Sequence, residues 1–111
     1  MDVIRKRQDF LAMRSADKAQ SASFLMLARQ NPENGASARL GLTVTKKLGS
    51  AVIRNRIRRR LRAAAREVFP AHACPGTDYV LIARKAAYDR NFTALLDDMK
   101  RALLRLSRNP T

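Results

Sequence analysis

The chain has 111 residues and carries 23 Lys and Arg against 9 Asp and Glu, a formal net charge of +14 at pH 7. This length suffices for one hydrophobic core, so we expect a single domain over residues 1–111 and exclude multi-domain mechanisms. Arginine, which binds phosphate bidentately, supplies 17 of the basic residues, so the charge favours a nucleic-acid partner. Leu, Ile, Val and Phe together number 26, enough to argue against a disordered chain.

The few cysteines and histidines limit the chemistry of the chain. Cys74 is the single cysteine, which excludes an internal disulfide and indicates a reducing compartment. With His72 it offers two of the four ligands of a zinc site, so no metal site is expected. No apolar run reaches the roughly 18 to 20 residues of a membrane span, and the N-terminus lacks a signal-peptide core. We therefore expect a cytoplasmic protein without a membrane partner.

The first half of the chain predicts a short helix and two strands. Residues 7–14 place apolar and polar side chains on opposite sides of a helix, and residues 15–23 are expected to break it. Residues 24–29 and 39–44 are apolar runs of strand length. Between them, residues 31–35 carry Pro and Asn-Gly turn chemistry, which favours an antiparallel hairpin between these two strands.

The second half predicts a helix, a strand and a helix. The first helix has an apolar stripe, which Pro70 is expected to close; its members are Ile53, Ile57, Leu61, Ala64 and Val68. Residues 78–83 form a third strand, and apolar residues at spacings of three and four predict a second helix over 92–106. The order α-β-β-α-β-α indicates a two-layer α+β fold, with a small mixed sheet packed by helices. General statistics favour a right-handed crossover between parallel strands, but the sequence does not fix its hand.

The basic charge is concentrated in one segment. No acidic residue occurs between Asn34 and Arg66, whereas the predicted helix there is rich in arginine. At about 100° per residue, Arg54 and Arg58 flank one side of the apolar stripe and Arg56 and Arg60 the other, while Asn55, Arg59, Arg62 and Arg66 point outward. The outward-pointing residues of this helix, here called the arginine fan, can neutralise RNA or DNA phosphates. A solvated face and a membrane-surface helix are the alternatives; like-charge repulsion argues against the first and an Ala-rich apolar face against the second.

The sequence shows no catalytic residues of its own. The single histidine is not paired with a nucleophile by a recognisable motif, and Gly49-Ser50 lacks the rest of a phosphate-binding loop. Asp97 and Asp98 are expected to be solvated or to compensate the dipole of the second helix. Phe10, beside a sheet, is a candidate for stacking on single-stranded bases, although aromatic residues more often lie in the core.

Several segments resemble the protein subunit of bacterial ribonuclease P. The most specific is Lys46-Lys47-Leu-Gly-Ser-Ala-Val-Ile-Arg54-Asn55-Arg56, which continues as a basic helix to Arg62. Asp9-Phe10, Gly41-Leu-Thr-Val-Thr45 and Asp78-Tyr-Val-Leu-Ile-Ala-Arg84-Lys85 are similar to the first helix, central strand and later strand of that family. The resemblance extends over about residues 5 to 106, in the same order.

The resemblance implies a left-handed βαβ crossover and a role in tRNA maturation. The family's protein binds a catalytic RNA and the single-stranded 5′ leader of precursor tRNA, and the ribonucleoprotein hydrolyses the phosphodiester that joins leader to tRNA. The chemistry belongs to the RNA and to Mg²⁺ held mainly by RNA phosphates. A monomeric protein in a 1:1 ribonucleoprotein is therefore expected, with no catalytic or metal-binding residue in the protein.

Site residues are carried over by position. The RNA-binding set is Lys46, Lys47, Arg54, Asn55, Arg56, Arg58, Arg59 and Arg62; the leader-binding set is Phe10, Arg14, Leu25, Leu27 and Thr43. Arg14 stands where members of the family often have a second aromatic residue, which predicts a weaker, more electrostatic contact with the leader. Two other functions fit the charge: a plain RNA-binding or ribosome-associated protein, and a protein-only nuclease.

Overall fold

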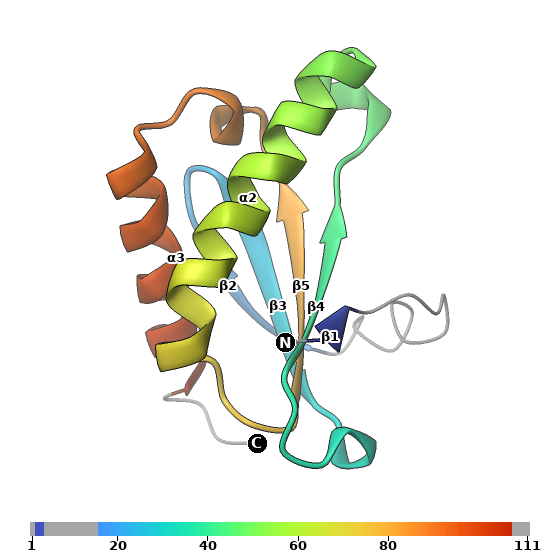
Figure 1. Cartoon of the computed structure of the whole chain (residues 1–111), viewed down its shortest axis with the longest axis vertical. Coiled ribbons are helices and arrows are strands. Elements are labelled where there is room, and N and C mark those ends of the chain that lie inside the picture. The colour runs from blue at the N-terminus through green and yellow to red at the C-terminus, as the bar shows by residue number, and fades with distance from the viewer. Residues whose placement is uncertain (1, 4–15, 108–111) are drawn as a thin grey trace.

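The computed structural model describes residues 2–3 and 16–107 (Figure 1). In chain order it contains β1 (Asp2–Val3), β2 (Asp17–Gln20), β3 (Phe24–Gln30), β4 (Arg39–Thr43), α2 (Ala51–His72), β5 (Thr77–Ala83) and α3 (Phe92–Ser107), with short 3₁₀ turns η2 (Pro32–Asn34), η3 (Lys46–Leu48) and η4 (Lys85–Tyr88). The three strands and two long helices predicted in this part of the chain are confirmed. The helix predicted over residues 7–14 lies outside the described residues.

The sheet is mixed, with strand order β1-β4-β5-β3-β2. β4 pairs in parallel with β1 and β5, while β3 pairs antiparallel with β5 and β2. The predicted hairpin between β3 and β4 is therefore wrong, because β5 lies between them. Six of the seven residues of β5 are buried, as the central strand of a covered sheet requires.

β2 lies in residues 15–23, the segment that was predicted only to end the first helix. It forms a hairpin with β3, and the connecting turn is closed by the Ser21 amide, which donates to the Phe24 carbonyl over 2.9 Å. The sequence Asp-Lys-Ala-Gln of β2 contains no β-branched or aromatic residue, so propensity gave no strand signal. Pairing with the apolar β3 decides its conformation instead.

The connection from β4 through α2 to β5 is left-handed. In Figure 1 the chain runs up β4, down α2 in front of the sheet, and up β5 to the left of β4. This confirms the hand that the resemblance implies and departs from the right-handed preference of such crossovers.

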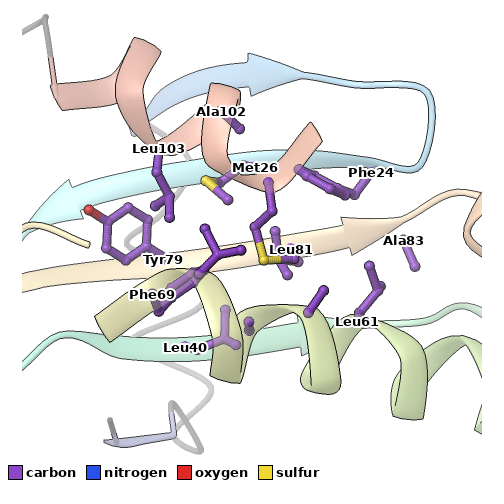
Figure 2. Packing of buried hydrophobic residues seen from close by; sticks show 14 of the residues in the cluster. Phe24, Met26, Leu40, Leu61, Phe69, Tyr79, Leu81, Ala83, Ala102 and Leu103 are labelled. Atoms are coloured by element: carbon purple, nitrogen blue, oxygen red, sulfur yellow. The ribbon is translucent and has the colours of Figure 1, made fainter. Parts of the chain in front are cut away.

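The core lies between one face of the sheet and the two helices. Alternate strand residues, including Phe24 and Met26 of β3 and Tyr79 and Leu81 of β5, point toward α2 and α3 (Figure 2). The rings of Tyr79 and Phe69 meet edge to face, with centroids 5.2 Å apart. Burial raises the pKa of Tyr79 to about 12.

The ends of α2 follow from local chemistry. Gly49 precedes the helix with φ 143°, and the Ser50 hydroxyl accepts the Ile53 amide as an N-cap. Pro70 does not end the helix as predicted, since α2 continues to His72. Proline in the last turn removes one amide from the helical ladder, while the next turn is retained because the Ala73 amide donates to the Phe69 carbonyl over 2.9 Å and Phe69 is buried.

Candidate nucleic-acid interface

The outward face of α2 carries the predicted arginine fan. Asn55, Arg59, Arg62 and Arg66 are all exposed. Within the described part of the chain, the three arginines of this group make no hydrogen bond or ion pair, and Asn55 accepts one bond, from Arg58 over 2.9 Å. Their guanidinium donors thus face solvent and are available to an anionic partner.

The arginines that flank the apolar stripe make contacts within the protein. Arg56 donates to the Tyr88 carbonyl over 2.9 Å and lies 4.9 Å from the centre of the Tyr88 ring. Arg60 donates through Nε to the Ala87 carbonyl, also over 2.9 Å, and through Nη2 to the Arg90 carbonyl. On the other flank, Arg54 donates to the Gly49 carbonyl over 3.3 Å. These contacts fix α2 against η4 and against its own N-terminal turn.

A shallow hollow lies at the N-terminal half of the fan. It has a volume of about 480 Å³ and is lined by Val52, Asn55, Arg58, Arg59 and Arg62. Val52 is 77% exposed, so an apolar side chain lies among the donors, where a ribose or base could contact it. The sequence analysis missed Val52, although its spacing of three, seven and ten residues from Asn55, Arg59 and Arg62 places it on the same face.

The two predicted lysines continue this surface. Lys46 and Lys47 lie in η3, directly before α2, and both are exposed. η3 also joins the fan to the end of β4, because Thr43 is separated from Lys46 by only two residues. The start of α2 and the end of β4 therefore lie at the same end of the molecule (Figure 1).

The face of the sheet opposite the helices holds the predicted leader residues that the structure describes. Leu25 of β3 and Thr43 of β4 both lie opposite Ile82 of β5, and Leu27 lies opposite Val80 in the next row. Leu27 and Val80 are buried, whereas Leu25, Thr43 and Ile82 are half-buried. The structure thus brings Leu25, Leu27 and Thr43 to one face, although Leu27 adds little surface. Phe10 and Arg14 lie outside the described residues.

A buried ion pair lies at the other end of this face, where β4 and β5 begin. Asp78 is 0% exposed and accepts from Nε and Nη2 of Arg39, each over 2.7 Å, and from the Asn31 amide over 3.1 Å. Arg39 belongs to the acid-free basic segment of the sequence, yet its charge is compensated inside the fold. Only the register between β4 and β5, which sets Arg39 opposite Asp78, reveals the pair.

Asp98 corrects the expectation of a solvated charge on α3. It is buried and accepts the Ser23 hydroxyl over 3.2 Å and the Arg90 guanidinium through two bonds, one of them 3.0 Å long. The hydrogen bonds to Asp98 and its negative charge raise the pKa of Arg90. The signal was available, because Asp98 lies three residues after Leu95 and four before Ala102, on the buried stripe of the helix.

Among residues 2–3 and 16–107, no three His, Cys, Asp or Glu side chains come together to form a metal site. The described helices likewise include none long and apolar enough to cross a membrane.

Comparison with known proteins places this chain in a family. The model of the family described as Ribonuclease P matches residues 2–107. The ribonuclease P protein component of Caulobacter vibrioides strain NA1000 is 46% identical over 104 residues, which cover 94% of this chain and 70% of the relative.

Two solved structures share the fold. The ribonuclease P protein of Staphylococcus aureus superimposes with a TM-score of 0.78 at 29% identity, covering 95% of this chain and 94% of that one. The protein from Thermotoga maritima gives a TM-score of 0.78 at 28% identity, covering 100% of both chains. The match over residues 2–107, the shared fold and the arginine-rich α2 lead to one conclusion: the chain belongs to the ribonuclease P protein family, the protein component of the ribonucleoprotein that cleaves the leader from precursor tRNA.

Proposed function

We propose that the outward face of α2 and the lysines of η3 bind the catalytic RNA subunit next to the cleavage site of precursor tRNA. The observation that carries this proposal is the set of exposed guanidinium groups of Arg59, Arg62 and Arg66, which lack an internal partner in the described part of the chain. RNA phosphates would supply the missing negative charge and release condensed counterions. Asn55, beside them, offers an amide to a phosphate or a base edge.

The two flanks of α2 take different parts in this proposal. Arg54 donates one hydrogen bond to the Gly49 carbonyl, and Arg58 donates one to the Asn55 side chain. Their remaining N–H donors would contact RNA. Arg56 is held by the Tyr88 carbonyl and ring, which fixes its direction before RNA binds. A guanidinium with a fixed direction loses less side-chain entropy on binding.

The leader of precursor tRNA is proposed to lie along the face of the sheet opposite the helices. Half-buried Leu25, Ile82 and Thr43 form a row across three strands there, and Leu27, which is buried, lies in the next row. Apolar side chains offer contact to unstacked bases, and the row ends near η3, where the basic surface begins. Phe10 and Arg14 would complete this site.

The cleavage chemistry is assigned to the RNA subunit. Mg²⁺ activates water and stabilises a leaving oxygen in metal-assisted phosphoryl transfer. We place this ion on phosphates of the RNA, as the family resemblance implies, and assign no metal-bound step to the protein. Its part is to hold RNA and leader in place, as one protein per RNA in the cytoplasm.

The deciding experiment is cleavage of precursor tRNA at low Mg²⁺. A bacterial ribonuclease P RNA is assayed with and without this protein, which has been freed of RNA. We expect accurate 5′ cleavage when both are present and little from either alone. Binding without any effect on cleavage would favour the plain RNA-binding protein, and cleavage by the protein alone would favour the protein-only nuclease.

A single substitution links that activity to α2. Arg59→Ala should weaken binding of the catalytic RNA and reduce the log–log salt slope of the affinity by about 0.7 to 0.9, the value of one lost phosphate contact. Lys100→Ala is the matched control, because it removes one exposed positive charge from α3. Equal effects of the two variants would show that Arg59 contributes only net charge.

A further inference from the structure

A second basic groove lies away from α2. It has a volume of about 620 Å³ and is formed by the end of β2, the turn that follows, and α3; its lining residues are Ala19, Gln20, Ser21, Ala22, Arg90, Asp98, Arg101, Ala102, Leu104 and Arg105. None of these belongs to α2 or to η3, and only Gln20, which lies opposite Leu25, is on the face of the sheet opposite the helices. Figure 1 shows α3 beside α2 on the same face of the sheet, at the edge where β2 lies.

The groove has an excess of positive charge. Arg101 and Arg105 are exposed, one helical turn apart on α3, and neither has an ion pair or hydrogen bond within the described residues. Asp98 is the one carboxylate in the lining, and it is bonded to Arg90. Asp17, two residues from Ala19 on β2, makes no ion pair with either arginine. Two guanidinium charges are therefore left for a ligand.

The walls of the groove are held together before any ligand binds. Asp98 bonds Arg90 on one side and the Ser23 hydroxyl of the turn on the other. Arg84 donates to the Ser21 carbonyl over 2.9 Å and to the Gln20 side chain over 3.2 Å, which adds a further guanidinium at the rim. A fixed concave surface of one charge concentrates the field on an anion.

We propose that this groove is a second RNA-binding site, which takes a stretch of phosphodiester backbone without reading its sequence. No aromatic side chain is among the ten lining residues, so base stacking has no platform there, and small side chains such as Ala22 and Ala102 leave the arginines accessible. The proposal rests on the function proposed above, since it adds a contact to the same ribonucleoprotein. The backbone is that of the catalytic RNA or of precursor tRNA.

A negative charge placed on each wall tests the groove. Arg101→Glu and Ala22→Glu place a negative charge on α3 and on the turn, respectively. A unit charge about 4 Å from a phosphate in water changes affinity by about fivefold. Ala22→Glu should therefore weaken RNA binding by about that factor at low salt, and Arg101→Glu, which changes the charge by two units, by more. Lys100→Glu is the control for the first change and Ala36→Glu for the second, because both positions are exposed and outside the groove.

Two assays separate the two RNA sources. In the first, each full-length variant binds bacterial ribonuclease P RNA alone; in the second, the preformed ribonucleoprotein binds precursor tRNA. Loss in one assay identifies which RNA occupies the groove. Thermal unfolding of each variant shows whether it is folded, and a photo-crosslinker at position 22 should label the same RNA in the otherwise unchanged chain.

The outcomes also separate this proposal from the function it rests on. If groove variants bind like their controls and position 22 gives no crosslink, while Arg59→Ala still weakens binding, the groove proposal is overturned and the α2 interface stands. If the unaltered protein neither binds the RNA nor assists cleavage, the proposed function fails. Selective loss from both walls supports the groove.

Discussion

At the scale of single residues, buried polar groups are matched to partners from distant parts of the chain. Asp78 pairs with Arg39 and Asp98 with Arg90, and both carboxylates are buried. Each pair is internally neutral, so the whole net charge of +14 remains for the other residues. Removing either carboxylate would take two charge-assisted hydrogen bonds from a partly buried guanidinium, which costs more than the pair itself contributes.

Tyr79 predicts a loss of stability at alkaline pH. Its ordinary pKa is 10.0, and burial raises the pKa to about 12 in the folded chain. The neutral phenol therefore contributes fully below pH 10, and its contribution is lost as the pH rises toward 12, because the unfolded chain ionises first. Two pKa units correspond to about 2 to 3 kcal/mol of unfolding free energy. Urea unfolding on both sides of this range measures the change.

The Tyr79→Phe variant provides the control for this effect. It lacks the ionisable phenol and also the bond of 2.8 Å that the hydroxyl accepts from the Cys74 amide, so it should be less stable at neutral pH by about 1 kcal/mol. The difference between the two proteins should then shrink or reverse near pH 12. A constant difference across the range would contradict the assignment of the alkaline loss to Tyr79.

At the scale of elements, α2 combines a structural flank with a binding face. Arg60 bonds the Ala87 and Arg90 carbonyls and lies 5.9 Å from the Phe92 ring, so it connects α2 to the segment before α3. Arg59, the next residue toward the N-terminus, points away from the protein. Adjacent positions of one helix are rotated by about 100°, which allows neighbouring arginines to serve different purposes.

Alanine substitutions at these neighbours should separate the two purposes. Arg60→Ala should lower the unfolding free energy by about 1 to 3 kcal/mol, since it leaves two carbonyls without their charged donor. Arg59→Ala should change it by less than about 0.5 kcal/mol and should instead reduce RNA affinity. Thermal unfolding and RNA titration of both variants check this. The same loss of stability in both would mean that the fan also supports the fold.

Periodicity predicted the elements of this chain better than their pairing. The apolar stripe of α2 and the buried run of β5 are local patterns, and each element forms where its pattern lies. The position of β5 between β3 and β4 is a long-range outcome that no local signal encodes, and β2 has its conformation only because β3 is beside it. The prediction that Pro70 ends α2 was wrong, because a proline in the last turn removes one amide from the helix and still allows it to continue to His72.

The candidate site divides in a similar way. The outward residues of α2, such as Arg59 and Arg62, follow from helix geometry and were placed correctly. The bonds of Arg56 to Tyr88, and the groove between α3 and the β2 turn, join segments that lie far apart in sequence. Val52 was missed for another reason: an apolar residue in a helix is expected to be buried, and here it is exposed.

At the scale of the whole molecule, the basic surface of η3 and α2 meets the face of the sheet opposite the helices at one end. After β4 ends at Thr43, the chain passes through the two lysines of η3 and reaches the start of α2, which carries the arginine fan. A single-stranded RNA lying across Leu25 and Thr43 would therefore reach the arginines of α2 without reversing its direction. Such a path would let one RNA strand contact both surfaces, which increases avidity without any new type of contact.

This arrangement predicts an effect that depends on the leader. Thr43→Glu adds a negative charge at the half-buried end of the row, so it should weaken binding of precursor tRNA to the ribonucleoprotein by about fivefold at low salt. Mature tRNA, which lacks a leader, should bind as before. Thr93→Glu is the matched control, because Thr93 is exposed on α3. Equal losses for precursor and mature tRNA would place the leader elsewhere, since only the leader distinguishes the two ligands.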